Sequence, residues 1–217
     1  MGFQTAIFDM DGTLLDSMSV WTTMGSRLMR QAGREPEPDL DERIRTMSLF
    51  QAAEYCRERY RLDQSVDELC DLVNATVRSY YQNEAPAKPG VEAYLKRLKT
   101  AGVRMYVATA TNRTLAEPAL ERTDLRPYFE GILTCGEIRC GKDSPRIYEL
   151  ALERLEGEKA STLVFEDALH AVETAVSAGF RVVGVQDASA RADEAKIRAL
   201  TETFICSYPA DAPDPAL

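Results

Sequence analysis

Short apolar runs alternate along the chain with longer segments in which apolar residues recur every three or four positions. The short runs are rich in β-branched and aromatic residues, and they predict buried strands at 5–8, 103–108, 131–135, 161–165, 181–185 and 203–206. The longer segments predict helices over 91–101, 115–122, 145–155, 168–178 and 191–200. Because strands separated by helices of this length form βαβ units, the chain predicts an α/β, Rossmann-like domain with a parallel sheet.

One stretch departs from this alternation, since the apolar spacing between the first two predicted strands is helical throughout. It predicts helices over 18–33, 39–47, 48–60 and 65–82. Ser65 and Glu68 have capping-box spacing at the start of the last one. A segment rich in proline, 85–90, then returns the chain to the α/β pattern.

The predicted organisation is therefore a discontinuous α/β core with an inserted helical cap. The core takes residues 1–16 and 86–208, the cap takes 17–85, and the proline-rich end, 209–217, is predicted to be disordered. A cap that two short linkers join to the core is expected to hinge over the strand ends, where it would admit substrate and exclude water.

Composition and charge narrow the range of partners. The chain has 217 residues and a net charge of −9, which argues against nucleic acid or an anionic membrane surface as the main partner. A small anionic substrate would need a local positive pocket. The five cysteines are scattered without a CxxC spacing, and no run approaches the roughly twenty apolar residues of a membrane span. We therefore expect reduced thiols and a soluble, cytoplasmic protein. We also expect a monomer, because an acidic, compact chain with a closable cap can work alone.

The first predicted strand ends in Asp9-Met10-Asp11-Gly12. Alternate side chains of an extended chain point the same way, so Asp9 and Asp11 share a face at the end of the strand where open α/β sheets bind ligands. Two carboxylates this close require either a cation between them or a proton on one of them. The first case describes a Mg²⁺ site, and the second pairs a proton donor with a nucleophile. Asp and Gly also favour turns, so the spacing alone leaves a plain strand-end turn open.

Polar residues follow other predicted strands as well. Thr109 comes after the strand over 103–108, where its hydroxyl and nearby backbone amides would form a phosphate cradle, although helix capping explains it equally. Lys142 precedes a helix that begins at Pro145, but a loop lysine is usually solvated. Glu166 and Asp167 follow the strand over 161–165, where a helix dipole also favours acids.

Together and in this order, these stretches resemble the four motifs of the haloacid dehalogenase-like (HAD) hydrolase superfamily. The matching strings are Ile-Phe-Asp-Met-Asp-Gly-Thr, Val-Ala-Thr-Ala-Thr, Gly-Lys-Asp-Ser-Pro and Val-Phe-Glu-Asp-Ala. The third departs from the common Gly-Lys-Pro-x-Pro, because Asp143-Ser144 replaces the usual proline. The helical insertion after the first motif resembles the subfamily with the α-helical (type C1) cap, which includes phosphoglycolate phosphatases and β-phosphoglucomutases.

The resemblance implies a Mg²⁺-dependent phosphatase that hydrolyses a small phosphorylated metabolite. Asp9 would be the nucleophile that forms an aspartyl-phosphate, and Asp11 would be the general acid and base. Lys142, Thr109 and the neighbouring Ala110 would hold the phosphoryl group. Dehalogenating members lack the second aspartate of the first motif, so the presence of Asp11 favours phosphoryl transfer.

The metal site implied by the same motifs is made of oxygen ligands. Mg²⁺ would be bound by Asp9, by Asp167 and by the backbone carbonyl of Asp11, with Glu166 either a ligand or one shell further out. Substrate choice is expected to lie in the cap. There Arg45 could hold a second anionic group of the substrate, or equally be a solvated surface arginine.

The sequence does not decide the roles of two other side chains or the identity of the substrate. Trp21, on the first predicted cap helix, would line the pocket or pack inside the cap, and we expect His170 to lie at the surface or cap a helix. Phosphoglycolate, hexose phosphates, polyol phosphates and nucleotides all fit the motifs.

Three alternative functions share this fold. A sugar-phosphate mutase of the β-phosphoglucomutase type carries a histidine on the first cap helix, but residues 17–84 contain no histidine here. A phosphonate-cleaving member would need a lysine in the cap, and the same residues contain none. A non-catalytic binding protein usually lacks one of the motif carboxylates or the motif lysine, and this chain retains them all.

Overall fold

The computed structural model describes residues 2–44, 47 and 49–214. The chain forms two compact units: Met1–Ser17 together with Ala85–Leu217, and the intervening Met18–Glu84. Among the described residues, no helix combines the length and the apolar character that crossing a bilayer requires.

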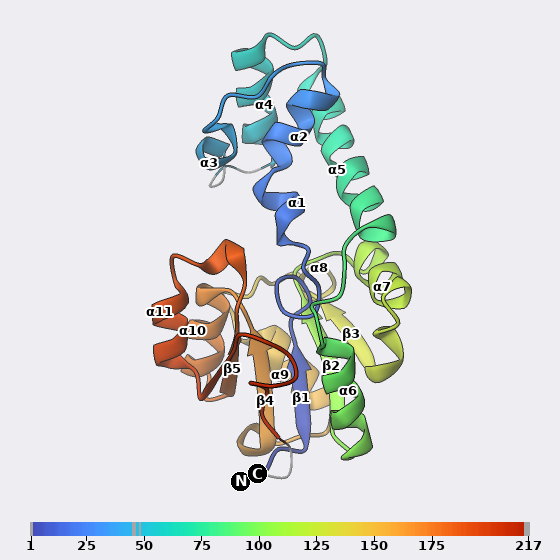
Figure 1. Cartoon of the computed structure of the whole chain (residues 1–217), viewed down its shortest axis with the longest axis vertical. Coiled ribbons are helices and arrows are strands. Elements are labelled where there is room, and N and C mark those ends of the chain that lie inside the picture. Colours follow the sequence, from blue (N-terminus) through green and yellow to red (C-terminus); the bar gives the residue numbers. More distant parts are fainter. Residues whose placement is uncertain (1, 45–46, 48, 215–217) are drawn as a thin grey trace. The chain divides into compact units, whose positions relative to one another are not determined.

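The first unit is built on a six-stranded parallel sheet with the strand order β3-β2-β1-β4-β5-β6 (Figure 1). The strands are β1 (Thr5–Phe8), β2 (Arg104–Thr109), β3 (Gly131–Thr134), β4 (Thr162–Glu166), β5 (Arg181–Val185) and β6 (Thr203–Ile205). All four residues of β1 are buried, as in a central strand with both faces covered. The strand order reverses between β1 and β4, so a topological switch point lies at their carboxyl ends.

Helices connect the strands and cover both faces of the sheet. They are α6 (Val91–Thr100), α7 (Arg113–Arg122), α8 (Cys135–Ile138), α9 (Arg146–Arg154), α10 (Leu169–Ser177) and α11 (Glu194–Leu200), with 3₁₀ turns η1 (Arg126–Tyr128), η2 (Lys159–Ser161) and η3 (Ala188–Ala190). On one face, Ile7 and Val164 belong to a core cluster with buried residues of α9, α10 and α11. On the other face, the rings of Phe8 and Phe165 stack 4.1 Å apart, and Tyr94 of α6 lies 5.9 Å from Phe165.

The exit and the return of the insertion are paired within the first unit. An antiparallel bridge joins Leu15 to Ala87. Backbone hydrogen bonds of 2.8 and 2.9 Å flank this bridge and tie residues 14–16 to residues 86–88. The chain therefore leaves the sheet domain and re-enters it at neighbouring points.

The second unit consists of helices α1 (Met18–Thr22), α2 (Met24–Gln31), α3 (Leu40–Ile44), α4 (Leu49–Tyr60) and α5 (Val66–Asn83). The predicted capping box starts α5: the Glu68 amide donates to Ser65 Oγ at 3.2 Å, and the Ser65 amide donates to Glu68 Oε2 at 2.8 Å. The single helix predicted over 18–33 is wrong, because it breaks into α1 and α2 at Thr23. The Thr23 hydroxyl donates to the backbone carbonyl of Ser19 at 2.7 Å and competes with the helical amides for that acceptor.

Two further segments differ from the sequence prediction. Cys135, predicted as the end of a strand, instead begins α8, because Thr134 and Glu137 form a capping box at that point. Residues 209–214 were predicted to be disordered, but the backbone carbonyl of Pro213 accepts a hydrogen bond from Tyr94 Oη at 3.0 Å. Residues 215–217 lie outside the described residues.

Candidate active site

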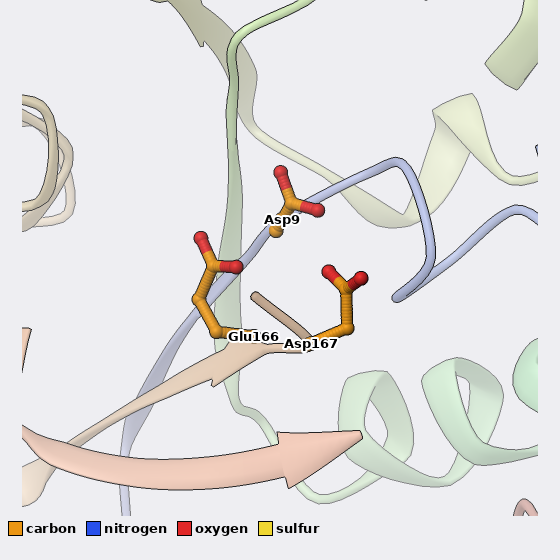
Figure 2. A group of neighbouring side chains, drawn as sticks. All are labelled: Asp9, Glu166 and Asp167. Atoms are coloured by element: carbon orange, nitrogen blue, oxygen red, sulfur yellow. The ribbon is translucent and has the colours of Figure 1, made fainter. Parts of the chain in front are cut away.

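Three carboxylates meet at the carboxyl ends of the neighbouring strands β1 and β4 (Figure 2). Asp9 follows β1, Glu166 is the last residue of β4, and Asp167 comes directly after it. One oxygen of each lies within 4.8 Å of the others. The side chains are deeply buried, with 5%, 1% and 3% of Asp9, Glu166 and Asp167 exposed. The fold thus gathers at its switch point three acids that are far apart in sequence.

Lys142 brings a positive charge to this acidic cluster. Its ammonium donates to Asp9 Oδ1 and, at 2.5 Å, to Glu166 Oε1. The residue is 8% exposed, so the loop before α9 carries a buried ammonium rather than the solvated side chain usual for a loop lysine. One ammonium beside three carboxylates leaves excess negative charge in a site that water barely reaches.

The pKa values of the cluster reflect that excess. Burial raises the pKa of Asp9 well above its ordinary value, Lys142 opposes the rise, and the neighbouring carboxylates add to it. Burial and the charge of Glu166 raise the pKa of Asp167 to about 8. Burial alone would lower the pKa of Lys142, but Asp9 and Glu166 raise it above its ordinary value. A divalent cation fits this site because hard oxygen ligands and uncompensated buried negative charge are both present.

Asp11 lies beside this cluster, with its carboxylate bound by two hydroxyl groups. Ser17 Oγ donates to Asp11 Oδ1 at 2.5 Å, and Thr111 Oγ1 donates to Asp11 Oδ2 at 2.7 Å. Among the described residues, the group of carboxylates close enough to share a metal ion contains Asp9, Glu166 and Asp167 but not the side chain of Asp11. The two hydroxyls hold the carboxylate of Asp11 in one orientation within the loop that follows β1.

Thr109 ends β2, next to β1, and is fully buried. Its Oγ1 accepts a hydrogen bond from the Thr111 amide at 3.0 Å, while α7 begins later and its N-cap, Asn112, uses no side-chain bond. The hydroxyl therefore stabilises the loop after β2 rather than capping α7. Ala110 lies in the same loop and is exposed. A ligand can therefore reach its backbone.

The turn after Asp9 packs directly against Asp167. Gly12 has φ +82°, and a Cβ at this position would lie 2.2 Å from Asp167 Oδ2. Thr13 Oγ1 donates to Asp167 Oδ1 at 3.3 Å. Glycine is thus required at position 12 for two separate reasons, the backbone conformation and the space taken by a carboxylate of the acidic cluster.

A comparison of Gly12→Ala with Gly179→Ala should separate the effect of the backbone conformation from the effect of the clash with Asp167. Gly179 also has φ +82°, but a Cβ there meets nothing within 4 Å. Each substitution should cost about 1–2 kcal/mol of unfolding free energy through backbone strain. Only Gly12→Ala should also displace Asp167, and a displacement of this kind costs roughly 10²-fold in turnover. Urea unfolding and assays of the hydrolysis of phosphorylated compounds that the motifs lead us to expect measure the two effects, and equal activity in both variants would contradict this account of Gly12.

Several partners of the site were not identified from sequence. Ser17 and Thr13 lie within or beside the first motif, so position along the chain was a usable signal for them. The pair of half-buried Lys88 and buried Asp187, 2.9 Å apart, gave no such signal, yet its charges shift the pKa of Asp167 in opposite directions. Tyr148, whose hydroxyl donates to Glu166 Oε1 at 2.7 Å, also had no signal, because its spacing is that of a core position of α9.

The cap residues singled out from sequence have mixed outcomes. Arg45 lies outside the described residues. Within the second unit, the Trp21 indole donates to Tyr81 Oη at 3.2 Å, while 45% of the residue is exposed, so it is only partly packed. His170 is exposed on α10, at the surface where it was expected.

Known proteins resemble this chain along most of its length. The family model of haloacid dehalogenase-like hydrolases matches residues 3–179, which include every residue of the candidate site described above except Asp187. The phosphorylated carbohydrates phosphatase of Thermotoga maritima is 30% identical over 183 residues, which cover 84% of this chain and 85% of the relative. The validoxylamine A 7'-phosphate phosphatase of Streptomyces hygroscopicus is 30% identical over 206 residues, covering 92% and 95%. A solved structure from Thermotoga maritima, provisionally assigned as a β-phosphoglucomutase, has a TM-score of 0.82 and 28% identity over 93% of this chain and 94% of that one.

Proposed function

The chain belongs to the haloacid dehalogenase-like hydrolase family and hydrolyses phosphate monoesters, and from this premise we propose a Mg²⁺-dependent phosphatase that acts through an aspartyl-phosphate on Asp9. Its substrates are small phosphorylated compounds, as the names of its relatives indicate. The observation that carries the proposal is the buried arrangement of Lys142 against Asp9 and Glu166, with Asp167 beside them.

The metal ligands would be Asp9, Asp167 and the backbone carbonyl of Asp11, with Glu166 as a ligand or one shell further out. Mg²⁺ held there supplies positive charge that attracts the phosphoryl oxygens and offsets the buried carboxylates. Six oxygen ligands are usual for this ion, so substrate and water oxygens would complete the set.

The chemical steps fall to side chains of this chain. Asp9 attacks phosphorus, so that a bond from its carboxylate oxygen to phosphorus forms as the bond to the leaving alkoxide breaks. Asp11 gives its proton to that alkoxide and then accepts a proton from the water that cleaves the aspartyl-phosphate. Lys142 and Thr109 hold the equatorial oxygens of the phosphoryl group in both steps. The hydroxyls of Ser17 and Thr111 orient the carboxyl group of Asp11 for the two proton transfers.

The proposed metal site predicts an unusual dependence of stability on pH. Because the pKa of Asp167 is about 8 in the folded protein and 3.8 in its reference state, the folded protein holds more protons than the unfolded chain between these values. The contribution of Asp167 to the unfolding free energy must then fall as pH rises from about 4 to 8 when a chelator is present. We expect Mg²⁺ to reverse the loss near pH 8, since binding to the folded state alone raises its stability.

Thermal unfolding from pH 5 to pH 8, with EDTA and with Mg²⁺, measures this effect. Asp167→Asn removes the titrating group, so its melting temperature should vary less with pH and respond less to Mg²⁺. A melting temperature that changes between pH 5 and pH 8 in EDTA by the same amount in wild type and in Asp167→Asn would contradict the raised pKa. A lack of Mg²⁺ stabilisation at pH 8 would contradict the metal site.

The function itself is tested by phosphate release from a panel of phosphorylated sugars, polyols, glycolate and nucleotides, with Mg²⁺ and with EDTA. Release that needs Mg²⁺ and favours one class of compound is the expected result. Interconversion of sugar phosphates in the presence of a sugar bisphosphate, without phosphate release, would instead identify the mutase alternative. No turnover of either kind would favour a non-catalytic role.

Some further properties belong to the same proposal. A cytoplasmic location is supported by the five cysteines, all of which are free thiols. Independence from nucleic acid and from anionic membranes is supported by the net charge of −9. We also propose a monomer, to be checked by light scattering.

A further inference from the structure

Glu166 is held by two buried donors that share one of its oxygens. Its Oε1 accepts hydrogen bonds from Lys142 Nζ at 2.5 Å and from Tyr148 Oη at 2.7 Å. Tyr148 is fully buried, and Lys142 also donates to Asp9 Oδ1. A continuous chain of hydrogen bonds therefore runs from a core tyrosine, through Glu166 and Lys142, to the proposed nucleophile.

The fold explains why a residue of α9 reaches Glu166. Side chains alternate along a strand, so Glu166 continues the face of β4 that carries Val164. That face packs against α9, whose third residue is Tyr148. The Tyr148 ring lies 6.1 Å from the ring of Phe180 in an edge-on arrangement that helps to fix its position. Burial raises the pKa of the Tyr148 phenol and the charge of Glu166 adds to the rise, so the hydroxyl keeps its proton and donates.

We propose that Tyr148 is a positioning residue that holds Lys142 on Asp9 by fixing the carboxylate of Glu166. The side chains of Glu166 and Lys142 each have many rotamers. The Lys142 ammonium stabilises the charge of the transferring phosphoryl group only when it is held beside Asp9, so the rotamers of both side chains must be restricted. Tyr148, with its ring set in the core, restricts Glu166, and Glu166 in turn restricts Lys142. Such partners of active-site groups commonly contribute about 10- to 100-fold to activity or ligand affinity.

Tyr148→Phe tests the proposal because it removes only the hydroxyl. This inference rests on the proposed function, in which Asp9 receives the phosphoryl group. We expect kcat to fall about 10- to 100-fold while KM changes by less than threefold, since Lys142 acts mainly on charge that develops in the transition state. The matched control is Tyr94→Phe, another fully buried tyrosine, whose hydroxyl donates to the backbone carbonyl of Pro213 at 3.0 Å. Its kcat should stay within threefold of wild type.

A second readout separates positioning from a general loss of packing. Orthovanadate, which adopts the five-coordinate geometry of phosphoryl transfer, should bind Tyr148→Phe about tenfold more weakly in the presence of Mg²⁺. Inorganic phosphate should bind both proteins alike. A general loss of packing would weaken both ligands together.

A double-mutant cycle with Glu166→Gln decides whether Tyr148 acts through Glu166. If it does, adding Tyr148→Phe to Glu166→Gln should change kcat less than threefold, although each single variant is impaired. Full additivity, or a Tyr148→Phe enzyme within threefold of wild-type kcat, would overturn the proposal while leaving the phosphatase intact. A wild-type protein that releases no phosphate from any compound would instead overturn the proposed function.

Discussion

Replacing Asp9 by asparagine should abolish phosphatase turnover, with kcat falling on the order of 10⁴- to 10⁶-fold, as when the nucleophile of a covalent mechanism is removed. The amide cannot attack phosphorus, so no aspartyl-phosphate can form. The fold should persist, because the pKa of Asp9 is raised and the neutral amide avoids burying a carboxylate among Glu166 and Asp167. We expect the melting temperature in EDTA to equal or exceed that of wild type.

The matched control for this loss of charge is Asp124→Asn. Asp124 is exposed, and its φ of 58° is one that asparagine adopts readily. Its turnover should equal that of wild type. Acid quenching during turnover should trap a phosphorylated wild-type enzyme and no phosphorylated Asp9→Asn. Appreciable turnover by Asp9→Asn would remove Asp9 as the nucleophile, whatever the metal dependence.

Replacing Lys142 by methionine should impair both activity and stability. The ammonium is a fixed positive charge beside Asp9, and removal of one such electrostatic group commonly costs about 10²- to 10³-fold in kcat. The variant also leaves two buried carboxylates, Asp9 and Glu166, without their cation, which costs about 3–5 kcal/mol of unfolding free energy when a partner of a buried pair is removed. The stability loss should be largest in EDTA at pH 8, because Mg²⁺ or protons compensate the carboxylates under other conditions.

Lys196→Met provides the comparison for Lys142→Met. Its side chain is 69% exposed and lies 3.6 Å from Asp193, so its removal should change stability by less than about 1 kcal/mol and leave kcat unchanged. Urea unfolding and kinetics of both variants, with and without Mg²⁺, complete the test. A Lys142→Met protein as stable in EDTA at pH 8 as Lys196→Met would show that the Lys142 ammonium does not offset the buried charges.

The sheet and the acids of the site were accessible from sequence for one physical reason. Parallel strands buried on both faces read as short, uninterrupted apolar runs, and the polar residue that ends each run marks the ligand-binding edge. Asp9 and Glu166 stand at such ends, and β1 and β4 prove to be hydrogen-bonded neighbours. The four-residue length of β1 was predicted because Asp9 interrupts the apolar run.

Features that depend on contacts between distant segments were not predicted from the sequence. Tyr148 has the spacing of any core residue of α9, and only the packing of α9 under β4 turns its hydroxyl toward Glu166. Lys88 and Asp187 are separated by nearly half the chain, and neither belongs to a motif. The break at Thr23 was missed because hydroxyl-to-carbonyl competition changes no apolar position.

The central place of β1 also has a consequence for synthesis of the chain on the ribosome. β1 precedes the other strands of the sheet, yet its neighbours β2 and β4 begin only at residues 104 and 162, after helices α1 to α5 of the described part of the insertion. Those helices make local contacts and are able to fold before β2 and β4 are available to pair with β1. An unpaired apolar strand invites aggregation unless charged residues adjoin it, and Asp9 and Asp11 follow β1 at once. The carboxylates proposed for catalysis are therefore also placed where charge opposes aggregation of the nascent chain before the sheet forms.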